Sequence, residues 1–397
     1  MTATRGIVVA VASRLFEPEV SAGAFRLGAL VRGLVRAGAR PHVVTSRAPR
    51  HAVSMAPLEG ASISRWPVLR DRGGNVRGYL QYASFDGPLF LRLLFTRFDV
   101  VVAESPPTTG LVAAAVAALR RRPLVYYAAD VWTDGVISMG APAAVVRLMR
   151  MMEVAVLRRA RTVLSVSDEV TDRLVALGAE RERIAMVGNG IDTAVFSPEV
   201  EAAEGGRYFV YTGTMSEWQQ PDVFIQAFAQ IAADYPDAHL RFFGQGAVEA
   251  RLRDLAAHLV PGRVTFGGVV SPADSARWIR GAAAALVSIV PGIGYDFARP
   301  TKTYAAAACG TPVLFAGAET GGDLVRRHGL GAAVPFQVEA VADAMRGLLA
   351  EAADGSTERR RPERAAWAQR NVSLAVTGEQ AARAVLGECS GSPTGRD

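Results

Sequence analysis

The chain contains a single lysine, Lys302, which lies in the segment Arg299-Pro300-Thr301-Lys302 before an expected helix. All the other residues among the 44 lysines and arginines are arginine. Lysine offers a compact point charge where arginine offers a planar fork. A compact cation beside the free N–H groups of a helix N-terminus suits a diphosphate. The alternative is that one lysine has persisted by drift. The residues of the surrounding loops are needed to choose between these two interpretations.

Three loops in the second half of the chain follow expected strands. Two are glycine turns, 211–215 and 243–246, which would bring backbone N–H groups onto a nucleotide. The third, residues 290–302, holds Asp296 and Arg299 and leads to Lys302. Ligands of open α/β sheets bind beyond the carboxyl ends of the strands. We therefore expect these loops to form one rim of a ligand site.

Three further loops in the first half contain polar side chains. The loop 13–26 carries Glu17 and Glu19 before a run of small residues that would let a ligand approach the backbone. These two glutamates are either solvated loop charges or site groups. In Asp130-Val131-Trp132 the aspartate would orient a sugar hydroxyl beside the ring, or cap a short helix. Glu104-Ser105-Pro106-Pro107 follows another strand.

Two classes of nucleotide enzyme are disfavoured by what these loops lack. The loop 13–26 has no G-x-G-x-x-G pattern, and no acidic residue stands in the usual place after the second strand, which counts against a nicotinamide enzyme. A P-loop lysine is also missing. Nucleic-acid binding is disfavoured because the arginines are not clustered among aromatic residues.

The elements that must position these loops alternate between strand and helix, which is typical of doubly wound α/β domains. The expected strands are 6–12, 41–45, 99–103, 123–128, 162–166, 207–212, 239–243, 263–266, 284–289 and 312–315. The expected helices are 21–37, 76–98 (broken near Gly87-Pro88), 109–122, 143–160, 168–177, 222–234, 247–259, 271–280, 337–351 and 362–386. A boundary is expected after Asn189-Gly190-Ile191-Asp192.

Composition sets further limits. With 397 residues, 50% of them hydrophobic, the chain can bury two sizeable cores. We expect no signal peptide and no transmembrane helix. Its two cysteines suit a reducing cytoplasm, and no metal-ligand cluster is expected. Residues 1–200 hold 25 arginines against 17 acidic residues, and such a basic half indicates an anionic partner or only solvated faces.

Taken in order, these motifs resemble the GT-B-fold, nucleotide-sugar-dependent glycosyltransferases of family 4, and most of all the cell-surface polysaccharide and amino-sugar transferases among them. The resemblance covers nearly the whole chain. It rests on Phe16-x-Pro18-Glu19-x3-Gly23-Ala24-x-Arg26, Glu104-Ser105-Pro106-Pro107, Asp130-Val131-Trp132, Ser165-Val166-Ser167, Asn189-Gly190-Ile191-Asp192, Phe196-x-Pro198, Tyr211-x-Gly213, Val264-x-Phe266-x-Gly268 and Pro300-x-Lys302 with Ala308-Cys309-Gly310-Thr311-Pro312-Val313.

The resemblance implies two Rossmann-like, doubly wound domains facing across a cleft. We expect an acceptor-side domain at 1–195, a donor-nucleotide domain at 196–362, a helix at 363–389 crossing back to the first domain, and a disordered tail at 390–397. The implied activity is a retaining, metal-independent transfer of a hexosyl group. The donor would be a UDP- or GDP-type sugar and the acceptor a hydroxyl of a lipid-linked, polysaccharide or small-molecule acceptor, with no cofactor.

The resemblance and the loops together assign roles to individual residues. For catalysis we expect Lys302, Arg299 and Asp130, with Lys302 neutralising the diphosphate leaving group. For the donor we expect Gly213, Thr214, Gly244, Asp296, Thr301, Lys302 and Tyr304. For the acceptor we expect Glu17, Gly23, Arg26 and Trp132. We expect the protein to act in the cytoplasm, at the inner face of the plasma membrane. The apolar stretch 79–98 would make peripheral contact with that membrane, or it would simply pack on the protein core.

Three departures from the family pattern favour an alternative function. A glutamate usually stands three residues after the lysine, where this chain has Ala305, and another stands where it has Phe297. The basic residue often found after the Tyr-x-Gly turn is also missing. Asp296, Tyr304 or Glu319 would have to compensate, or the protein is a non-catalytic GT-B protein that binds a partner or a nucleotide sugar. For a third candidate, a GT-B nucleotide-sugar epimerase, we find no matching motif.

Overall fold

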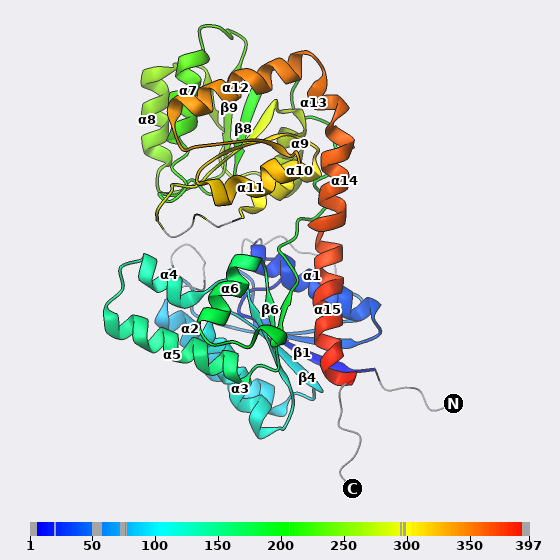
Figure 1. Ribbon diagram of the computed structural model, residues 1–397. Coiled ribbons are helices and arrows are strands. Elements are labelled where there is room, and N and C mark those ends of the chain that lie inside the picture. Colours follow the sequence, from blue (N-terminus) through cyan, green and yellow to red (C-terminus); the bar gives the residue numbers. More distant parts are fainter. Residues whose placement is uncertain are drawn as a thin grey trace. The chain divides into compact units, whose positions relative to one another are not determined.

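The computed structural model describes residues 6–19, 21–49, 58–71, 76, 78–205, 207–293, 296 and 299–390. The chain divides into two compact units (Figure 1). Unit 1 comprises Met1–Asn189 and Leu374–Asp397, and unit 2 comprises Gly190–Ser373.

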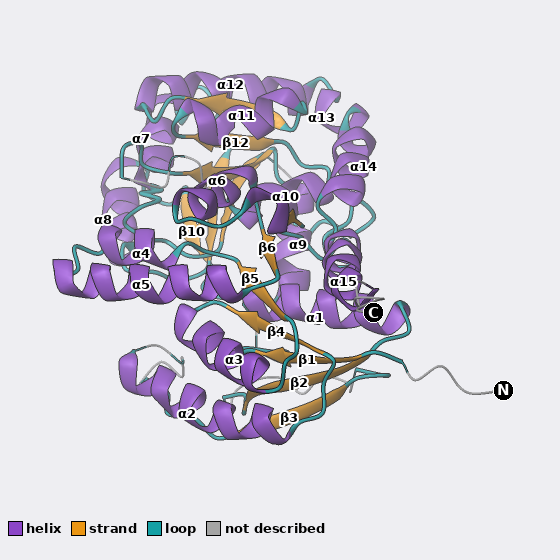
Figure 2. Cartoon of the chain, turned by 60° about the horizontal axis from the view of Figure 1, so that its bottom comes forward, coloured by secondary structure: helices purple, strands orange, loops and turns teal. Residues whose placement is uncertain are grey.

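Unit 1 is built on a sheet of seven parallel strands in the order β3-β2-β1-β4-β5-β6-β7. The strands are β1 (Val8–Ala12), β2 (Arg40–Ser46), β3 (Ser62–Trp66), β4 (Val100–Glu104), β5 (Leu124–Ala128), β6 (Thr162–Ser165) and β7 (Ile184–Met186). The helices are α1 (Ala22–Arg36), α2 (Tyr79–Phe95), α3 (Pro107–Leu119), α4 (Trp132–Ser138), α5 (Ala143–Arg159), α6 (Asp168–Ala176) and α15 (Leu374–Ser390). In Figure 2, α1 and α2 lie on opposite faces of this sheet.

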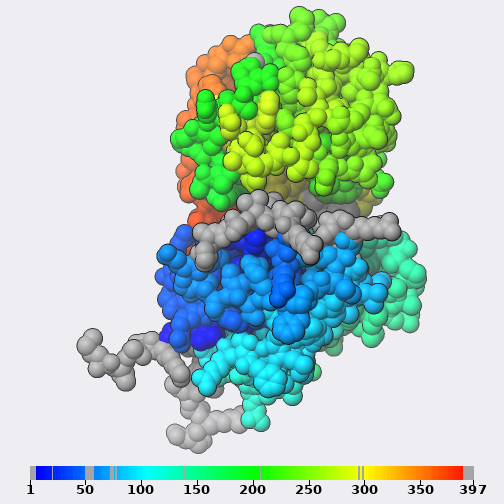
Figure 3. Space-filling model, turned by 180° about the vertical axis from the view of Figure 1, so that it is seen from behind, coloured from blue at the N-terminus to red at the C-terminus, as the bar shows by residue number. Residues whose placement is uncertain are grey.

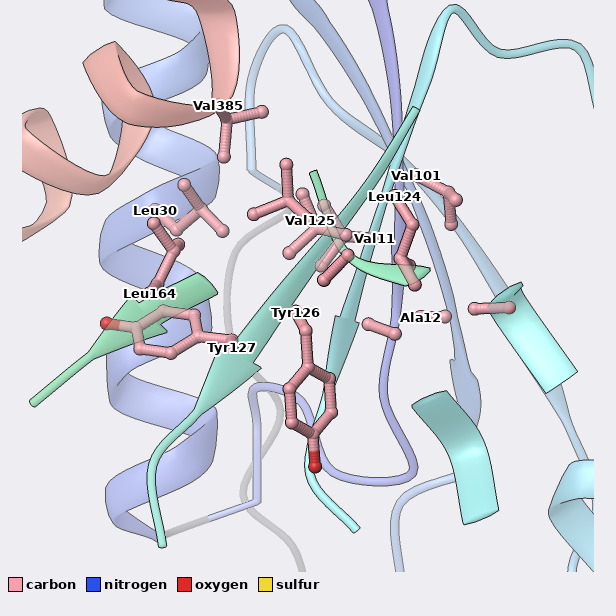
Figure 4. Close-up of a cluster of buried hydrophobic side chains, with 14 of the residues drawn as sticks. Val11, Ala12, Leu30, Val101, Leu124, Val125, Tyr126, Tyr127, Leu164 and Val385 are labelled. Atoms are coloured by element: carbon pink, nitrogen blue, oxygen red, sulfur yellow. The ribbon is translucent and has the colours of Figure 1, made fainter. Parts of the chain in front are cut away.

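The central strands of unit 1 are buried on both faces, which explains why they are continuous apolar runs. Adjacent residues of β5 serve different faces, as Figure 4 shows for Tyr126 and Tyr127. Tyr126 packs so closely on α3 that a Cβ on Gly110 would stand 2.9 Å from its ring. The glycine therefore lets the helix approach the sheet.

Helix α15 lies against α1 through a pair of glycines. A Cβ on Gly33 would stand 2.5 Å from the carbonyl oxygen of Gly378, and a Cβ on Gly378 would stand 2.4 Å from that of Ala29. Two small residues of α15, Ala381 and Ala382, are also buried in this core. The last helix is thus an integral layer of unit 1, although its sequence is far from the rest of that unit.

Unit 2 repeats this plan with six parallel strands in the order β10-β9-β8-β11-β12-β13. The strands are β8 (Tyr208–Thr212), β9 (His239–Phe243), β10 (Val264–Phe266), β11 (Ala284–Ser288), β12 (Val313–Ala316) and β13 (Gly331–Val334). The helices are α7 (Asp222–Ile231), α8 (Glu249–Leu259), α9 (Pro272–Gly281), α10 (Thr301–Ala308), α11 (Glu319–Arg327), α12 (Val338–Ala353), α13 (Ser356–Arg359) and α14 (Arg361–Asn371). The expected pair of Rossmann-like, doubly wound domains is confirmed.

The order of the strands in each sheet indicates where ligands would bind. In each sheet the strand order reverses at the first strand of the unit, between β1 and β4 and again between β8 and β11. Loops leaving such a pair of strands diverge, and the crevice beyond their carboxyl ends is where open α/β sheets bind ligands. The loops that follow β1, β4, β8 and β11 are therefore the candidate ligand-binding loops.

Two expected helices differ from the structure. The stretch 76–98 was expected to break near Gly87-Pro88, but α2 runs unbroken with Pro88 inside it. Its inner face holds Phe85, Leu89 and Leu93, and this burial outweighs the one hydrogen bond that proline cannot donate. The single helix expected over 362–386 is instead α14 and α15. No helix among the described residues is long and apolar enough to span a bilayer.

The break between α14 and α15 moves the domain boundaries. The expected boundaries lay at 195/196 and 362/363, whereas the units meet at 189/190 and 373/374. The N–H of Ile191 donates to the carbonyl oxygen of Val372 at 2.7 Å, and Ile191 forms a β-bridge with Ser373. This contact holds both connections in unit 2. The tail expected to be disordered falls, apart from Ser390 at the end of α15, outside the described residues.

Candidate functional site

In unit 2 the lysine lies at the crevice between β8 and β11. Lys302 is the second residue of α10, whose N-cap, Pro300, provides no side-chain cap. The Lys302 Nζ donates to the carbonyl oxygen of Thr214 at 3.1 Å and to Oε1 of Gln219 at 3.1 Å. Both partners belong to the loop after β8. The two loops that the topology brings together are thus joined by the only lysine of the chain.

The same amine lies over an aromatic ring. The Lys302 Nζ is 3.7 Å from the centroid of the Tyr211 ring, a cation–π distance. Tyr211 ends the buried part of β8 and is fully buried. Burial lowers the pKa of Lys302 well below its ordinary value, because charging an amine is unfavourable where water is excluded. An anionic ligand beside the amine would favour its charged form.

The two expected glycine turns pack on each other instead of presenting their N–H groups. The N–H of Gly213 donates to the carbonyl oxygen of Phe243 at 2.8 Å, and that of Gly244 to Gly268 at 2.7 Å. Both glycines have positive φ, +109° and +128°. A Cβ on Gly244 would stand 2.0 Å from the carbonyl oxygen of Gly213. The N–H groups of Gly213 and Gly244 are thus used within unit 2, and the two glycines allow close approach of the turns. A nucleotide contact by these turns stays a prediction.

The remaining expected donor residues are spread over the loop after β11 and the start of α10. Thr301 is exposed at the first position of α10, and Arg299 is half-buried just before it. The Asp296 carboxylate accepts from the N–H of Gly292 at 2.8 Å, so it stabilises its own loop. Tyr304 is 4% exposed and lies in the core of unit 2, so its ring serves packing.

Only some of the positions at which the chain departs from the family pattern lie within the described residues. Ala305 is 5% exposed and packs in the same core as Tyr304, so no carboxylate is supplied from that turn of α10. Glu319, the first residue of α11, is almost fully exposed and only 4.0 Å from Arg326. Phe297 lies outside the described residues. The described part of unit 2 therefore offers Lys302, and Arg299 three residues before it in sequence, as cations for a diphosphate at this crevice.

In unit 1 the crevice between β1 and β4 is filled by a polar network. Glu104, at the end of β4, accepts from the hydroxyl of Ser13 at 2.6 Å and from Arg26 at 3.4 Å. Arg26 also donates to the side chain of Asn189 at 3.2 Å. A Cβ on Gly23 would stand 2.7 Å from the Glu104 carboxylate. Gly23 and Arg26, both expected to hold an acceptor, thus accommodate Glu104, a residue to which we had assigned no role.

Glu17 is also engaged within the unit. It is 7% exposed, and its two oxygens accept from Arg32 at 2.8 and 3.1 Å. A Cβ on Gly28 would stand 1.9 Å from one of these oxygens, so the glycine makes room for the pair. The carboxylate fastens the loop after β1 to α1, so it is not the solvated charge that was one of the two expectations for Glu17. Its contact with an acceptor stays a prediction.

The last expected acceptor residues lie after β5. Asp130 is exposed, and the N-cap of α4 is Val131, so the aspartate does not cap this helix. Trp132 is half-buried and meets the ring of Tyr82 edge to face at 5.9 Å. The guanidinium of Arg14 lies over both rings, 4.4 Å from Tyr82 and 5.8 Å from Trp132. Asp130 is therefore an exposed carboxylate two residues before Trp132, whose ring is packed among other side chains.

Sequence reasoning missed the acidic residue that holds the backbone at Trp132 and Thr133. Glu153 of α5 is fully buried and accepts from the backbone N–H groups of Trp132 and Thr133, both at 2.9 Å. It also accepts from the Thr133 hydroxyl at 2.6 Å. Burial raises the pKa of Glu153, although these hydrogen bonds oppose the shift. The available signal was an acidic residue between Met152 and Val154 in an otherwise apolar stretch.

Comparison with known families gives the same division into two units. A model of the glycosyl transferase 4-like domain matches residues 22–190, and a model of the glycosyl transferases group 1 matches residues 206–351. The chain belongs to the group 1 glycosyltransferases. As a group 1 glycosyltransferase it has the family that its motif order indicated, and the matches span most of both units.

Relatives of this group 1 glycosyltransferase differ in how far they can be compared. A D-inositol 3-phosphate glycosyltransferase from Acidothermus cellulolyticus is 31% identical over 157 residues. That match covers 35% of this chain and 34% of the relative, so the chain spans about a third of the length of the curated relative it matches.

Solved structures confirm the GT-B fold over nearly the whole chain. The sucrose-phosphate synthase of Thermosynechococcus elongatus matches with a TM-score of 0.74 at 18% identity, covering 98% of this chain and 100% of that one. Anabaena HepE, in complex with UDP and glucose, matches with a TM-score of 0.67 at 15% identity, covering 96% of this chain and 100% of that one. At such identities these likenesses concern the fold.

Proposed function

We propose that the protein is an active glycosyltransferase that moves a sugar from a nucleoside-diphosphate sugar to a hydroxyl group of an acceptor. The observation that carries the proposal is the position of Lys302. It joins the loops after β8 and β11 at the crevice of unit 2, and its amine is held by Thr214 and Gln219. A cation fixed at the N-terminus of α10 is suited to a diphosphate.

In the proposed reaction the chain's own cations replace a metal ion. When the bond between the sugar and the diphosphate breaks, negative charge develops on the leaving phosphate. The Lys302 amine would stabilise that charge, with Arg299 assisting from the residues just before α10. Retention of the anomeric configuration is part of the proposal, through the family resemblance. A UDP-type donor is favoured because Anabaena HepE, of the same fold, binds UDP and glucose.

The proposed acceptor side is unit 1. Asp130 is the exposed carboxylate at the end of β5, and it would orient an acceptor hydroxyl beside the ring of Trp132. Trp132 is held in place by Glu153, which accepts from the backbone N–H groups of Trp132 and Thr133. The inositol phosphate in the name of the Acidothermus relative is a small polyol, and it gives one acceptor to test directly.

The same proposal includes a lipid-linked acceptor and a location at the inner face of the plasma membrane. Three large apolar residues on one side of α2 are exposed: Leu80 at 73%, Leu91 at 56% and Phe95 at 82%. In Figure 3 the part of the chain that contains α2 is coloured light blue to cyan and contributes to the surface of unit 1. Apolar side chains in this arrangement would insert shallowly among lipid head groups, and the basic balance of residues 1–200 favours anionic lipids.

The alternative function is a non-catalytic protein that binds a nucleotide sugar or a partner. Its specific support is the buried Ala305, at a position where the family usually has a glutamate. A ribose held without that carboxylate would lose a charge-assisted hydrogen-bond pair worth about 1.5–3 kcal/mol. Such a protein would bind a nucleotide weakly and release no free sugar or product.

Turnover decides between the two. The wild type is incubated with UDP-glucose, UDP-N-acetylglucosamine and GDP-mannose, with and without inositol phosphate or a membrane extract, and released nucleotide is measured. We expect acceptor-dependent release by the wild type, and a loss of about 10²–10³-fold in Lys302→Ala with little change in Tm. Nucleotide binding without release from any donor would favour the alternative, and a large fall in Tm would make Lys302 structural.

A further inference from the structure

The amine of Lys302 lies in a seat formed by three residues, Tyr211, Thr214 and Gln219, here called the lysine seat. Its nearest groups are the Thr214 carbonyl oxygen and Gln219 Oε1, both at 3.1 Å, and the face of the Tyr211 ring at 3.7 Å. All three present partial negative charge to the amine. No carboxylate contacts the Lys302 amine among the described residues.

Gln219 is a buried member of the seat that is held at its side chain and at its backbone. It is 4% exposed, and its Oε1 accepts from the Tyr211 hydroxyl at 2.6 Å as well as from Lys302. Its backbone carbonyl accepts from the hydroxyl of Ser288, the last residue of β11, at 2.7 Å. A glutamine anchored at both ends can place its amide oxygen accurately, whereas a solvated side chain cannot.

The chemistry of residue 219 determines what charge the seat leaves on the lysine. An ammonium group has three donors, and the seat provides two oxygen acceptors, so one N–H can be directed to a ligand. A neutral amide holds the amine without cancelling its charge. A carboxylate at the same place would hold it equally well but neutralise it, and would repel a phosphate. An apolar side chain would leave the amine with one acceptor fewer.

We propose that Gln219 is a positioning residue, which fixes the Lys302 amine over Tyr211 and leaves its charge uncompensated for the diphosphate of the donor. The claim about the donor rests on the proposed function, whereas the claim about position and charge concerns the chain alone. Burial adds to the effect, because a desolvated amine gains more from a phosphate partner than a solvated one does.

The position and charge of Lys302 can be read without any ligand, because the protein has one lysine. Protein labelled with [6-13C]lysine gives a single Cε resonance, whose chemical shift is followed with pH. We expect the titration midpoint of Gln219→Glu to rise by about one pH unit or more, since an opposite charge favours the ammonium. The midpoint of Gln219→Leu should fall, since the charged form loses an acceptor.

The matched control is Gln245→Leu, which changes an exposed glutamine in the loop after β9. Its lysine resonance should titrate as in the wild type. Midpoints that are the same in the wild type, Gln219→Leu and Gln219→Glu would overturn the proposal. All variants are melted first, so that a fall in Tm large enough to indicate partial unfolding is recognised. In that case Gln219→Leu is replaced by Tyr211→Phe, which removes the hydroxyl that donates to Gln219 and to the Thr214 carbonyl oxygen.

The donor part is tested by calorimetric titration of the same proteins with UDP and GDP. We expect the Kd of the nucleotide that binds to rise by about 10-fold or more in Gln219→Glu, and to be unchanged in Gln245→Leu. Equal affinity in Gln219→Glu and the wild type would overturn the inference while the proposed function stands. A wild type that binds neither nucleotide would reject the proposed function, and the lysine resonance would still decide whether Gln219 positions Lys302.

Discussion

Lys302 crosses directly over Gly213, so that a Cβ built on Gly213 would stand 3.0 Å from the lysine Cε. The lysine side chain thus reaches its partners in the loop after β8 by passing a residue that has no side chain. The glycine that we expected to bring a nucleotide close to the backbone also brings the lysine close to it. The two strongest signals of the sequence, the only lysine and the glycine of the Tyr211-x-Gly213 turn, therefore lie in contact.

Gly213→Ala should therefore affect ligand binding as well as stability. Alanine is strained at the φ of +109°, and its methyl group would push Lys302 out of the lysine seat. The matched control is Gly268→Ala, at a φ of +68° with open space around the added Cβ. We expect both variants to lose about 1–3 kcal/mol of unfolding free energy. Only Gly213→Ala should weaken nucleotide binding, and equal affinities in a calorimetric titration would contradict this account of the glycine.

Gly378→Ala should destabilise unit 1. The added Cβ would stand 2.4 Å from the carbonyl oxygen of Ala29, so α15 must move away from α1. We expect a loss of about 1–3 kcal/mol, visible as a lower midpoint in urea unfolding. Gly387→Ala, on the same helix with nothing near the added Cβ, should be neutral or slightly stabilising. The same midpoint for both variants would show that the close packing of the two helices is not important for stability.

The two carboxylates expected at the acceptor should behave differently. Glu17→Ala leaves Arg32 without its bidentate partner and should cost about 1.5–3 kcal/mol of unfolding free energy. Asp130→Ala removes an exposed side chain, so Tm should be unchanged while acceptor-dependent transfer falls. Melting curves and transfer assays on both variants check this contrast. Unchanged transfer in Asp130→Ala would remove Asp130 from the acceptor site.

Asp86 on α2 should make stability depend on pH. Burial raises the pKa of this carboxyl, while the hydroxyl of Thr109, which donates to it at 2.7 Å, and the charge of Arg14 oppose the shift. A raised pKa in the folded state means that the protonated group adds stability below 3.8, its ordinary value, and that this stability is lost as pH rises through the raised pKa. Asp86→Asn cannot titrate there.

Urea unfolding of the wild type and Asp86→Asn should therefore be compared at several pH values. We expect the unfolding free energy of the wild type, relative to the variant, to fall as pH rises from 3.8 to the raised pKa. A difference that is constant over this range would mean that Asp86 has the same pKa in the folded and unfolded states.

The parts of the fold that the sequence predicts are those with strong local signals. Central strands such as Val100–Glu104 and Leu124–Ala128 are continuous apolar runs, and α1 and α6 begin after the serine caps Ser21 and Ser167. The edge strand β3 was missed because its side chains are only partly buried, which leaves no apolar run in the sequence. The break between α14 and α15 depends on a contact with Ile191 that no local pattern encodes.

At the candidate site, the sequence predicts the lysine and its neighbour Thr214 but not Gln219. Lys302 was identifiable because it is the only lysine, and Asp130 because it ends a buried strand. Gln219 and Glu153 were not, because their roles come from contacts with residues distant along the chain. The pairing of Glu17 with Arg32 was not predicted either, because no local pattern of the sequence pairs the loop after β1 with α1.

The most direct test of the central claim is a thermal-shift and calorimetric screen of the wild type and Lys302→Ala against UDP, GDP, ADP, dTDP and their sugars, without added metal. A ligand at about 100 times its Kd adds about 2.7 kcal/mol of stability, which shifts the melting transition measurably. We expect one nucleoside diphosphate to stabilise the wild type and to lose its effect in Lys302→Ala. No shift with any nucleotide, or an equal shift in both proteins, would contradict the claim that Lys302 holds the donor diphosphate.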